Sequence, residues 1–161
     1  MNIDMNGINI DVVNMLIERN LHISSAESCT GGLFSALITD VPGSSEIFDE
    51  SIVTYSNEAK MIELGVKEET LRRFGAVSRQ TAKEMAEGIC AHTNADIGVA
   101  ITGIAGPGGG SENKPVGTVF AALHTSNGTD VYHLLINGSR SQVREETCRF
   151  VFEKLVELLK D

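Results

Sequence analysis

The sequence has no tryptophan, only three cysteines and no long apolar run. The cysteines, Cys29, Cys90 and Cys148, are odd in number and never take CxxC spacing, which argues against a disulfide framework and a structural zinc site. No apolar stretch reaches the roughly 18 residues of a membrane span, and residues 1–7 lack the basic and apolar regions of a signal peptide. We therefore expect a cytoplasmic protein that does not bind membranes.

Positive charge is scarce as well. The chain has 13 Lys and Arg against 22 Asp and Glu, a net charge of -9, and its basic residues form no long stripe. We therefore expect no nucleic-acid partner. No metal site is predicted either, because no two histidines have metal-ligand spacing such as HxxxH; they are His22, His92, His124 and His133. An anionic substrate would have to be held by a local pocket of hydrogen-bond donors.

Predicted strands and helices alternate along the 161 residues. Apolar periodicity, with N-caps at Ser56 and Ser78, predicts helices at 8–17, 31–39, 56–61, 67–73, 78–93 and 141–160. Apolar and β-branched runs predict strands at 21–25, 52–55, 97–102, 118–124 and 131–136, with a hairpin turn at Asn127-Gly128. This order indicates one α/β domain, residues 1–161, with a mixed sheet of about five strands between helical layers.

A turn rich in small residues follows the first predicted strand. In this segment, residues 26–32 (AESCTGG), the Ser28 hydroxyl is a candidate nucleophile, and the N–H groups of Thr30, Gly31 or Gly32 are a candidate oxyanion hole. Helix capping by Ser28 and Thr30 is the alternative, which the turn alone favours. The segment is not a GxSxG elbow and no histidine lies near it in sequence, so a Ser-His-Asp triad has little support.

Two other residues bear on this site. Cys29, beside Glu27, is an alternative nucleophile for a Cys-Glu-Lys amidohydrolase of the nitrilase type, although buried cysteine more often acts as a small apolar residue. Lys60, one helical turn beyond the Tyr55 strand end, is a candidate base. A free lysine has a pKa of about 10.4, so this role requires a drop of roughly 3 units. A solvated lysine on a helix surface is the alternative, which the sequence alone favours.

A second turn, residues 102–110 (TGIAGPGGG), is too glycine-rich for regular structure. Backbone N–H groups around Gly103 and Gly106 can hold phosphate oxygens, and the Arg140 guanidinium can add a bidentate contact. The GxxxxGK[ST] order of a P-loop is absent, since Lys114-Pro115 follows the glycines without Ser or Thr. A plain flexible loop is the alternative. Because both turns follow predicted strands, they are expected to meet in one crevice.

Five segments, in this order, closely resemble the CinA C-terminal domain family, the nicotinamide mononucleotide deamidases. They are residues 26–32 (AESCTGG), 54–60 (TYSNEAK), 75–78 (GAVS), 102–107 (TGIAGP) and 114–118 (KPVGT). The resemblance extends from about Ile8 to Leu159. It implies a three-layer α/β/α sandwich with a mixed, mostly parallel sheet. It also implies hydrolysis of nicotinamide mononucleotide to nicotinate mononucleotide and ammonia, in pyridine nucleotide recycling.

The resemblance also implies a role for each site residue. Ser28 would be the nucleophile, Lys60 the base and Tyr55 a hydroxyl that relays or positions the proton, in a serine-lysine amidohydrolase that uses no metal or cofactor. The residues implied for substrate binding are Thr30, Gly31, Thr102, Gly103, Gly106 and Arg140. Ser139 departs from the family pattern, which often has an acidic or amide residue there, so the exact phosphate contact stays open.

Longer family members carry an additional N-terminal domain with an assigned nucleotide pyrophosphatase activity, and nothing in this sequence corresponds to it. We therefore expect a stand-alone deamidase, and the family leads us to expect a homodimer. A rival from another class is a non-catalytic nucleotide-binding module with a competence or damage-related role. Release of ammonia from nicotinamide mononucleotide separates this rival from the enzyme.

Overall fold

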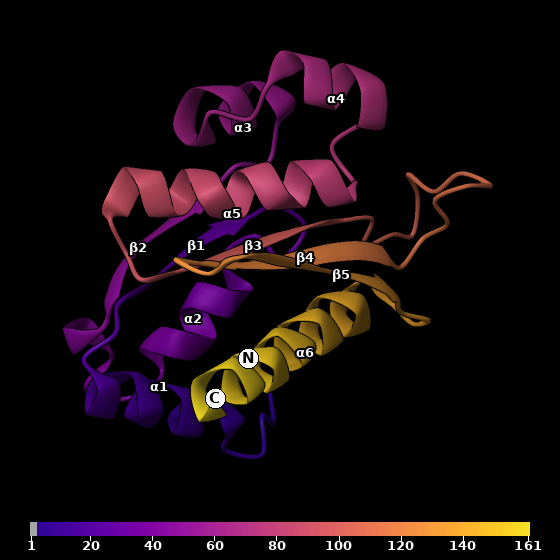
Figure 1. Cartoon of the computed structure of the whole chain (residues 1–161). Helices are drawn as coiled ribbons and strands as arrows, with labels where there is room; N and C mark the ends of the chain where they lie inside the picture. The colour runs from indigo at the N-terminus through magenta and orange to yellow at the C-terminus, as the bar shows by residue number, and fades with distance from the viewer. Residues whose placement is uncertain (1–2) are drawn as a thin grey trace.

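A five-stranded mixed sheet forms the centre of the computed structural model, which describes residues 3–161 (Figure 1). The strand order is β2-β1-β3-β4-β5. The strands are β1 (Ile23–Glu27), β2 (Phe48–Val53), β3 (Ile97–Gly103), β4 (Thr118–Thr125) and β5 (Gly128–Leu135). Strand β1 is parallel to β2 and β3, whereas β4 is antiparallel to both β3 and β5. Only β4 therefore runs against the other strands, and the sheet is mixed and mostly parallel, as the resemblance implied.

Helices cover both faces of this sheet and complete a three-layer α/β/α sandwich (Figure 1). One layer consists of α1 (Ile8–Arg19), α2 (Leu33–Thr39) and α6 (Arg140–Lys160). The other layer consists of α3 (Asn57–Leu64), α4 (Glu68–Phe74) and α5 (Arg79–Thr93). A short 3-10 helix, η1 (Ser44–Glu46), precedes β2. Among the residues described, no helix has both the length and the apolar character needed to cross a membrane.

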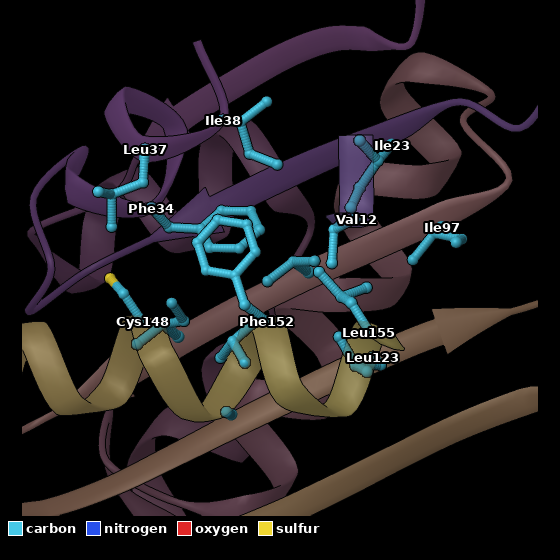
Figure 2. Close-up of a cluster of buried hydrophobic side chains, with 14 of the residues drawn as sticks. Val12, Ile23, Phe34, Leu37, Ile38, Ile97, Leu123, Cys148, Phe152 and Leu155 are labelled. Carbon is cyan, nitrogen blue, oxygen red and sulfur yellow. The ribbon is translucent and has the colours of Figure 1, made fainter. Parts of the chain in front are cut away.

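The larger hydrophobic core lies between the sheet and the layer of α1, α2 and α6 (Figure 2). Phe34 of α2 stacks on Phe152 of α6 with ring centroids 4.9 Å apart, and Val12 and Leu155 are fully buried beside them. Burying a side chain of this size stabilises the fold by about 1.5–3 kcal/mol. This packing anchors α6, so its first residue, Arg140, has a fixed place at one edge of the sheet.

On the opposite face, α5 packs against β3 and β4 through Met85 and Ile89. Two glycines permit close approach here. A side chain at Gly98 would overlap the backbone of α5, and one at Gly88 would overlap the last residue of α3. Helix α3 therefore rests directly on α5, which fixes the height of α3 above the sheet.

The elements predicted from the sequence all exist, but two of them start later than expected. Strand β1 starts two residues late because Leu21 completes the end of α1, where its N–H donates to the Leu16 carbonyl. Helix α2 starts at Leu33 because Gly31 and Gly32 have φ angles of 57° and 94°, outside the helical region.

The strand predicted at 52–55 starts and ends earlier in the sequence than expected, since β2 covers Phe48–Val53. Its first half carries Asp49 and Glu50 on an exposed sheet edge, so it lacks the apolar pattern that identifies a strand. As a consequence, Thr54 and Tyr55 follow the strand rather than form it, and their segment leads directly to the N-cap of α3.

Candidate active site

Ser28 occupies the residue directly after β1, at the edge of the sheet where β1, β2 and β3 end. Its N–H donates to the Ile101 carbonyl of β3 at 2.9 Å, so the turn continues the sheet by one residue. Its side chain is 9% exposed. Ser28 is thus fixed by the neighbouring strand and still reachable from one side.

Lys60 lies on the first turns of α3, which begins where Ser56 caps the helix by accepting the Ala59 N–H at 3.0 Å. The Lys60 side chain is only 1% exposed, which rules out the solvated surface lysine that was the alternative. Its Nζ donates to the Thr54 carbonyl oxygen at 2.6 Å and lies 3.0 Å from Ser28 Oγ. The amine is therefore aimed at the candidate nucleophile.

Burial lowers the pKa of Lys60 below its ordinary value of 10.5. Within residues 3–161 no carboxylate forms an ion pair with this amine, and the opposing electrostatic effect of Cys29 on the pKa is smaller than the effect of burial. A lowered pKa is what a lysine needs to act as a base, since only the neutral amine accepts a proton.

Cys29 belongs to the core cluster that includes Cys148 of α6, and it also contributes to the lining of the cleft. It is 5% exposed, and burial raises the pKa of its thiol to about 11. Its neighbour Glu27 is fully buried, and its carboxylate accepts backbone N–H groups of Gly32, Phe34 and Ser35 at 2.9–3.1 Å. The Cys-Glu-Lys arrangement is therefore not assembled, because the thiol is protonated at neutral pH and the carboxylate caps α2.

The N–H groups that the structure leaves available for an oxyanion hole differ from those predicted from the sequence. The Gly31 N–H donates to the Ser28 carbonyl at 3.0 Å, and the Gly32 N–H donates to Glu27, so neither is available to a substrate. The N–H groups of Cys29 and Thr30 donate to no other residue in the described part of the chain. Thr30 is completely buried and outside the cleft lining, whereas Cys29 lines the cleft, so the Cys29 N–H is the candidate oxyanion donor that remains.

A cleft of about 280 Å³ opens above the Lys60–Ser28 pair. It is lined by Ser28, Cys29, Tyr55, Lys60, Ala76, Val77, Thr102, Gly103, Ile104, Ala105, Gly106, Gly108, Gly109 and Arg140. The two small-residue turns therefore meet in one crevice, as predicted from their positions after strands. The lining also includes Ala76 and Val77, from the connection between α4 and α5, which sequence reasoning had not placed at the site.

Two of the predicted substrate-binding residues lie outside the lining. Thr30 is completely buried, and its carbonyl accepts a hydrogen bond from Arg144 of α6 at 2.8 Å. Gly31 is part of the turn that leads into α2. Both residues therefore belong to the turn that carries the candidate nucleophile, but neither lines the cleft.

Arg140 and Tyr55 meet at the mouth of the cleft. The Arg140 guanidinium donates to the Tyr55 hydroxyl at 2.9 Å and to the Gly106 carbonyl at 2.8 Å. The Tyr55 ring is 62% exposed, and its hydroxyl forms no hydrogen bond with Ser28 or Lys60. Tyr55 therefore contacts the guanidinium in this structure, rather than the pair that it was expected to serve as a proton relay.

The glycine-rich loop, residues 104–117, forms the other wall of the cleft. The N–H groups of Ala105, Gly106, Gly108, Gly109 and Gly110 donate to no acceptor in the described residues, so they are available to an anion. The glycines also have packing roles. A side chain at Gly106 would overlap Val116, and one at Gly103 would lie 2.7 Å from Val119 Cγ2.

A larger hollow of about 590 Å³ lies at the opposite end of the sheet, beside the start of β3 and the β4–β5 turn. Its lining includes Cys90, Asp96 and His124, but neither Ser28 nor Lys60. Burial raises the pKa of Cys90 to about 11, so its thiol is a poor nucleophile at neutral pH. Of these two hollows in the described residues, the smaller one places a serine hydroxyl beside a buried amine, so it is the candidate active site.

No cluster of three or more His, Cys, Asp or Glu side chains suited to a metal ion occurs in residues 3–161.

Comparisons with known proteins identify the family of this chain. The profile of the CinA C-terminal domain matches residues 6–159. The chain belongs to this family. A relative from Acetivibrio thermocellus, provisionally named a competence-damage inducible protein, is 56% identical over 139 residues, or 86% of this chain and 34% of the relative. The CinA-like protein of Kosmotoga olearia is 51% identical over 142 residues, or 88% of this chain and 34% of the relative.

This CinA-family chain spans about a third of the length of the curated relatives that it matches. Solved structures match it over nearly its whole length. The crystal structure of competence/damage inducible protein CihA from Agrobacterium tumefaciens has a TM-score of 0.94 at 42% identity, and the match covers 98% of this chain and 96% of that one. A CinA superfamily protein from Klebsiella pneumoniae also has a TM-score of 0.94, at 34% identity and 98% coverage of both chains.

Some features of the CinA-family site could not be found from sequence patterns. The carbonyl of Thr54 holds the Lys60 amine, and Ala76 and Val77 line the cleft, yet a carbonyl and two small apolar side chains carry no chemical signature. The one signal available was the resemblance itself, because its second and third segments, 54–60 and 75–78, contain these residues.

Proposed function

We propose that this domain hydrolyses the carboxamide of nicotinamide mononucleotide to nicotinate mononucleotide and ammonia, with Ser28 as nucleophile and Lys60 as base. The observation that carries the proposal is the buried contact of 3.0 Å between Lys60 Nζ and Ser28 Oγ at the floor of the cleft. The substrate follows from the resemblance to the nicotinamide mononucleotide deamidases and from the anion-binding groups around the cleft.

The first half of the reaction uses Lys60 as a proton carrier. Neutral Lys60 takes the Ser28 proton while Oγ attacks the carboxamide carbon, and the carbonyl oxygen becomes an oxyanion. The candidate donor to that oxyanion is the N–H group of Cys29, which lines the cleft. The Lys60 ammonium then gives its proton to the amide nitrogen, the carbon–nitrogen bond breaks, and ammonia leaves an ester on Ser28.

The second half reverses these roles with water as the nucleophile. Lys60, neutral again, takes a proton from water as the water oxygen attacks the ester carbon. The ester bond to Oγ breaks and the Lys60 proton returns to Ser28. The carboxylic acid that forms loses the second proton of the water to solvent, and nicotinate mononucleotide is released as a carboxylate. The Thr54 carbonyl, 2.6 Å from Nζ, holds the amine in place in both halves.

Substrate orientation falls to the opposite wall of the cleft. The Arg140 guanidinium and the N–H groups of Ala105, Gly106, Gly108 and Gly109 provide a positive rim suited to a phosphate group. Tyr55 supports this rim, since its hydroxyl accepts one of the Arg140 N–H groups. The carboxamide would then lie toward Ser28, with the phosphate at the rim.

The decisive experiment measures ammonia released from nicotinamide mononucleotide by the wild type, Ser28→Ala and Cys29→Ala. Loss of the hydroxyl should reduce kcat by about a thousandfold or more, because no acyl ester can form. Cys29→Ala should retain activity within about tenfold, since the thiol lies in the core. The reverse ranking would assign the chemistry to the cysteine. Binding without turnover by the wild type would favour a non-catalytic nucleotide-binding module.

A further inference from the structure

The glycine-rich loop, residues 104–117, extends away from the sheet between β3 and β4 (Figure 1). It is closed at its base, where the Ile104 N–H donates to the Thr118 carbonyl and the Gly117 N–H donates to the Ile104 carbonyl, both at 2.8 Å. At its tip the Ser111 N–H donates to the Lys114 carbonyl at 2.8 Å. The middle of the loop, which lines the cleft, has no such backbone bonds of its own.

Two side-chain hydrogen bonds connect this loop to distant elements. Arg140 of α6 donates to the Gly106 carbonyl, and Lys114 Nζ donates to the Phe74 carbonyl at 2.7 Å. Phe74 is the last residue of α4, where unpaired helix carbonyls favour a positive charge. At Gly75 the chain turns with a φ of 78°, and the ammonium lies 3.5 Å from where a side chain would begin.

The segment that receives Lys114 is itself well fixed. The Gly75 carbonyl accepts the hydroxyls of Ser78 and Thr81 at 3.0 and 2.8 Å, and the Ala76 carbonyl accepts the Thr102 hydroxyl at 2.8 Å. Three consecutive carbonyls, from Phe74 to Ala76, therefore accept side-chain donors. This segment continues into the cleft wall at Ala76 and Val77, so it is a rigid support for the loop.

We propose that Lys114 is a positioning residue that latches the glycine-rich loop to the end of α4 and so sets the affinity for the phosphate-bearing substrate. The proposal rests on the function proposed above for the identity of that substrate. Lys114 is not among the residues that line the cleft. It acts through the loop: with the latch in place, the N–H groups of Ala105, Gly106, Gly108 and Gly109 are held at the rim, and without it they must be ordered when the substrate binds.

The test compares Lys114→Met with Lys83→Met, which removes the same charge from an exposed site on α5. For nicotinamide mononucleotide, Lys114→Met should raise KM about tenfold and leave kcat within about twofold, whereas Lys83→Met should change neither. Nicotinamide riboside, which lacks the phosphate, should be turned over equally by all three proteins. Lys114→Arg keeps a charged donor and should recover most of the lost affinity.

A second measurement does not depend on catalysis. Hydrogen exchange of residues 104–117 in the free protein, which include the bonded amides of Ser111 and Gly117, should be faster in Lys114→Met, with the free energy of unfolding unchanged. If the wild type releases no ammonia, the proposed function fails, and the exchange experiment still decides the latch. Unchanged exchange, or faster exchange with an unchanged KM in an active enzyme, overturns the proposal.

Discussion

Charged side chains at the two ends of the sheet differ in exposure and in whether they have an oppositely charged partner. At the end where β1 and β3 begin, His22 pairs with Asp49 at 2.7 Å and His92 with Glu50 at 3.2 Å, and all four side chains remain partly exposed. At the other end, Lys60 is buried without an acidic partner. The larger hollow belongs to the first end and the nucleophile to the second. In the described residues, the candidate nucleophile therefore lies beside a buried amine without a carboxylate partner rather than in the larger hollow, and such burial is typical of functional sites.

Substitution of Lys60, the buried amine of this comparison, should have the largest effect on activity. Lys60→Met removes the titrating amine and should lower kcat by about a thousandfold, and Lys60→Arg should fail as well because a guanidinium stays protonated. In the wild type, the rate should rise with pH through the lowered lysine pKa. The measurement is a pH–rate profile of all three proteins. If Lys60→Arg kept near wild-type turnover, Lys60 would act through its positive charge and not as the base.

Arg140 should come next, because its guanidinium belongs to the substrate rim rather than to the reacting pair. Arg140→Ala should lower kcat/KM for nicotinamide mononucleotide. The corresponding loss of transition-state stabilisation should be roughly 2–4 kcal/mol, as expected when a charge-assisted contact is removed from a partly dry site. The riboside serves as the internal control, since it has no phosphate to lose. Equal losses for both substrates would show that Arg140 acts through Tyr55 and Gly106 instead.

The buried amine should also leave a signature in stability. Because the pKa of Lys60 is lower in the folded state than when unfolded, the unfolded chain binds more protons between that lowered pKa and 10.5. The free energy of unfolding of the wild type should rise with pH in this window, relative to Lys60→Met. Chemical denaturation at several pH values measures the difference. Parallel curves for the two proteins would mean that Lys60 keeps an ordinary pKa.

The smallest effect is expected at the opposite end of the sheet. Asp49 raises the pKa of His22 above 6.5, chiefly through their hydrogen bond. This stabilisation is complete below pH 6.5 and is lost as pH rises through the raised pKa. Asp49→Asn should therefore cost about 0.5 kcal/mol or less, only at the acidic end, because the pair is exposed. Turnover of Asp49→Asn should equal that of the wild type. A large loss of activity would show that this end of the sheet also contributes to function.

Sequence reasoning succeeded where a pattern has one physical meaning. The order of strands and helices, the Ser56 and Ser78 caps and the meeting of the two turns all follow from periodicity and capping chemistry. It could not decide the state of Lys60, because a polar helix residue is buried or exposed according to what packs over it. Here α5 supports α3 through the contact at Gly88, a long-range effect that no local pattern records.

The oxyanion donors were misassigned for a related reason. Gly31 and Gly32 look like open backbone, yet Glu27 and the Ser28 carbonyl take up their N–H groups. The sequence of a turn shows which residues are flexible. Only the three-dimensional structure shows which of its N–H groups already donate to acceptors within the turn. The role of Glu27 changed accordingly, from a candidate catalytic carboxylate to the cap of α2.

The two residues of the candidate catalytic pair depend on strands that differ in how many neighbouring strands they have. Ser28 follows β1, which is bonded on both sides, whereas Lys60 is tied to the segment after β2, which has β1 as its only neighbour. Edge strands open more readily than central ones. Fraying of β2 on heating would withdraw the amine from the hydroxyl while both cores stay packed. Thermal inactivation would then precede melting, and the onset temperature of activity loss would measure the detachment of a single strand.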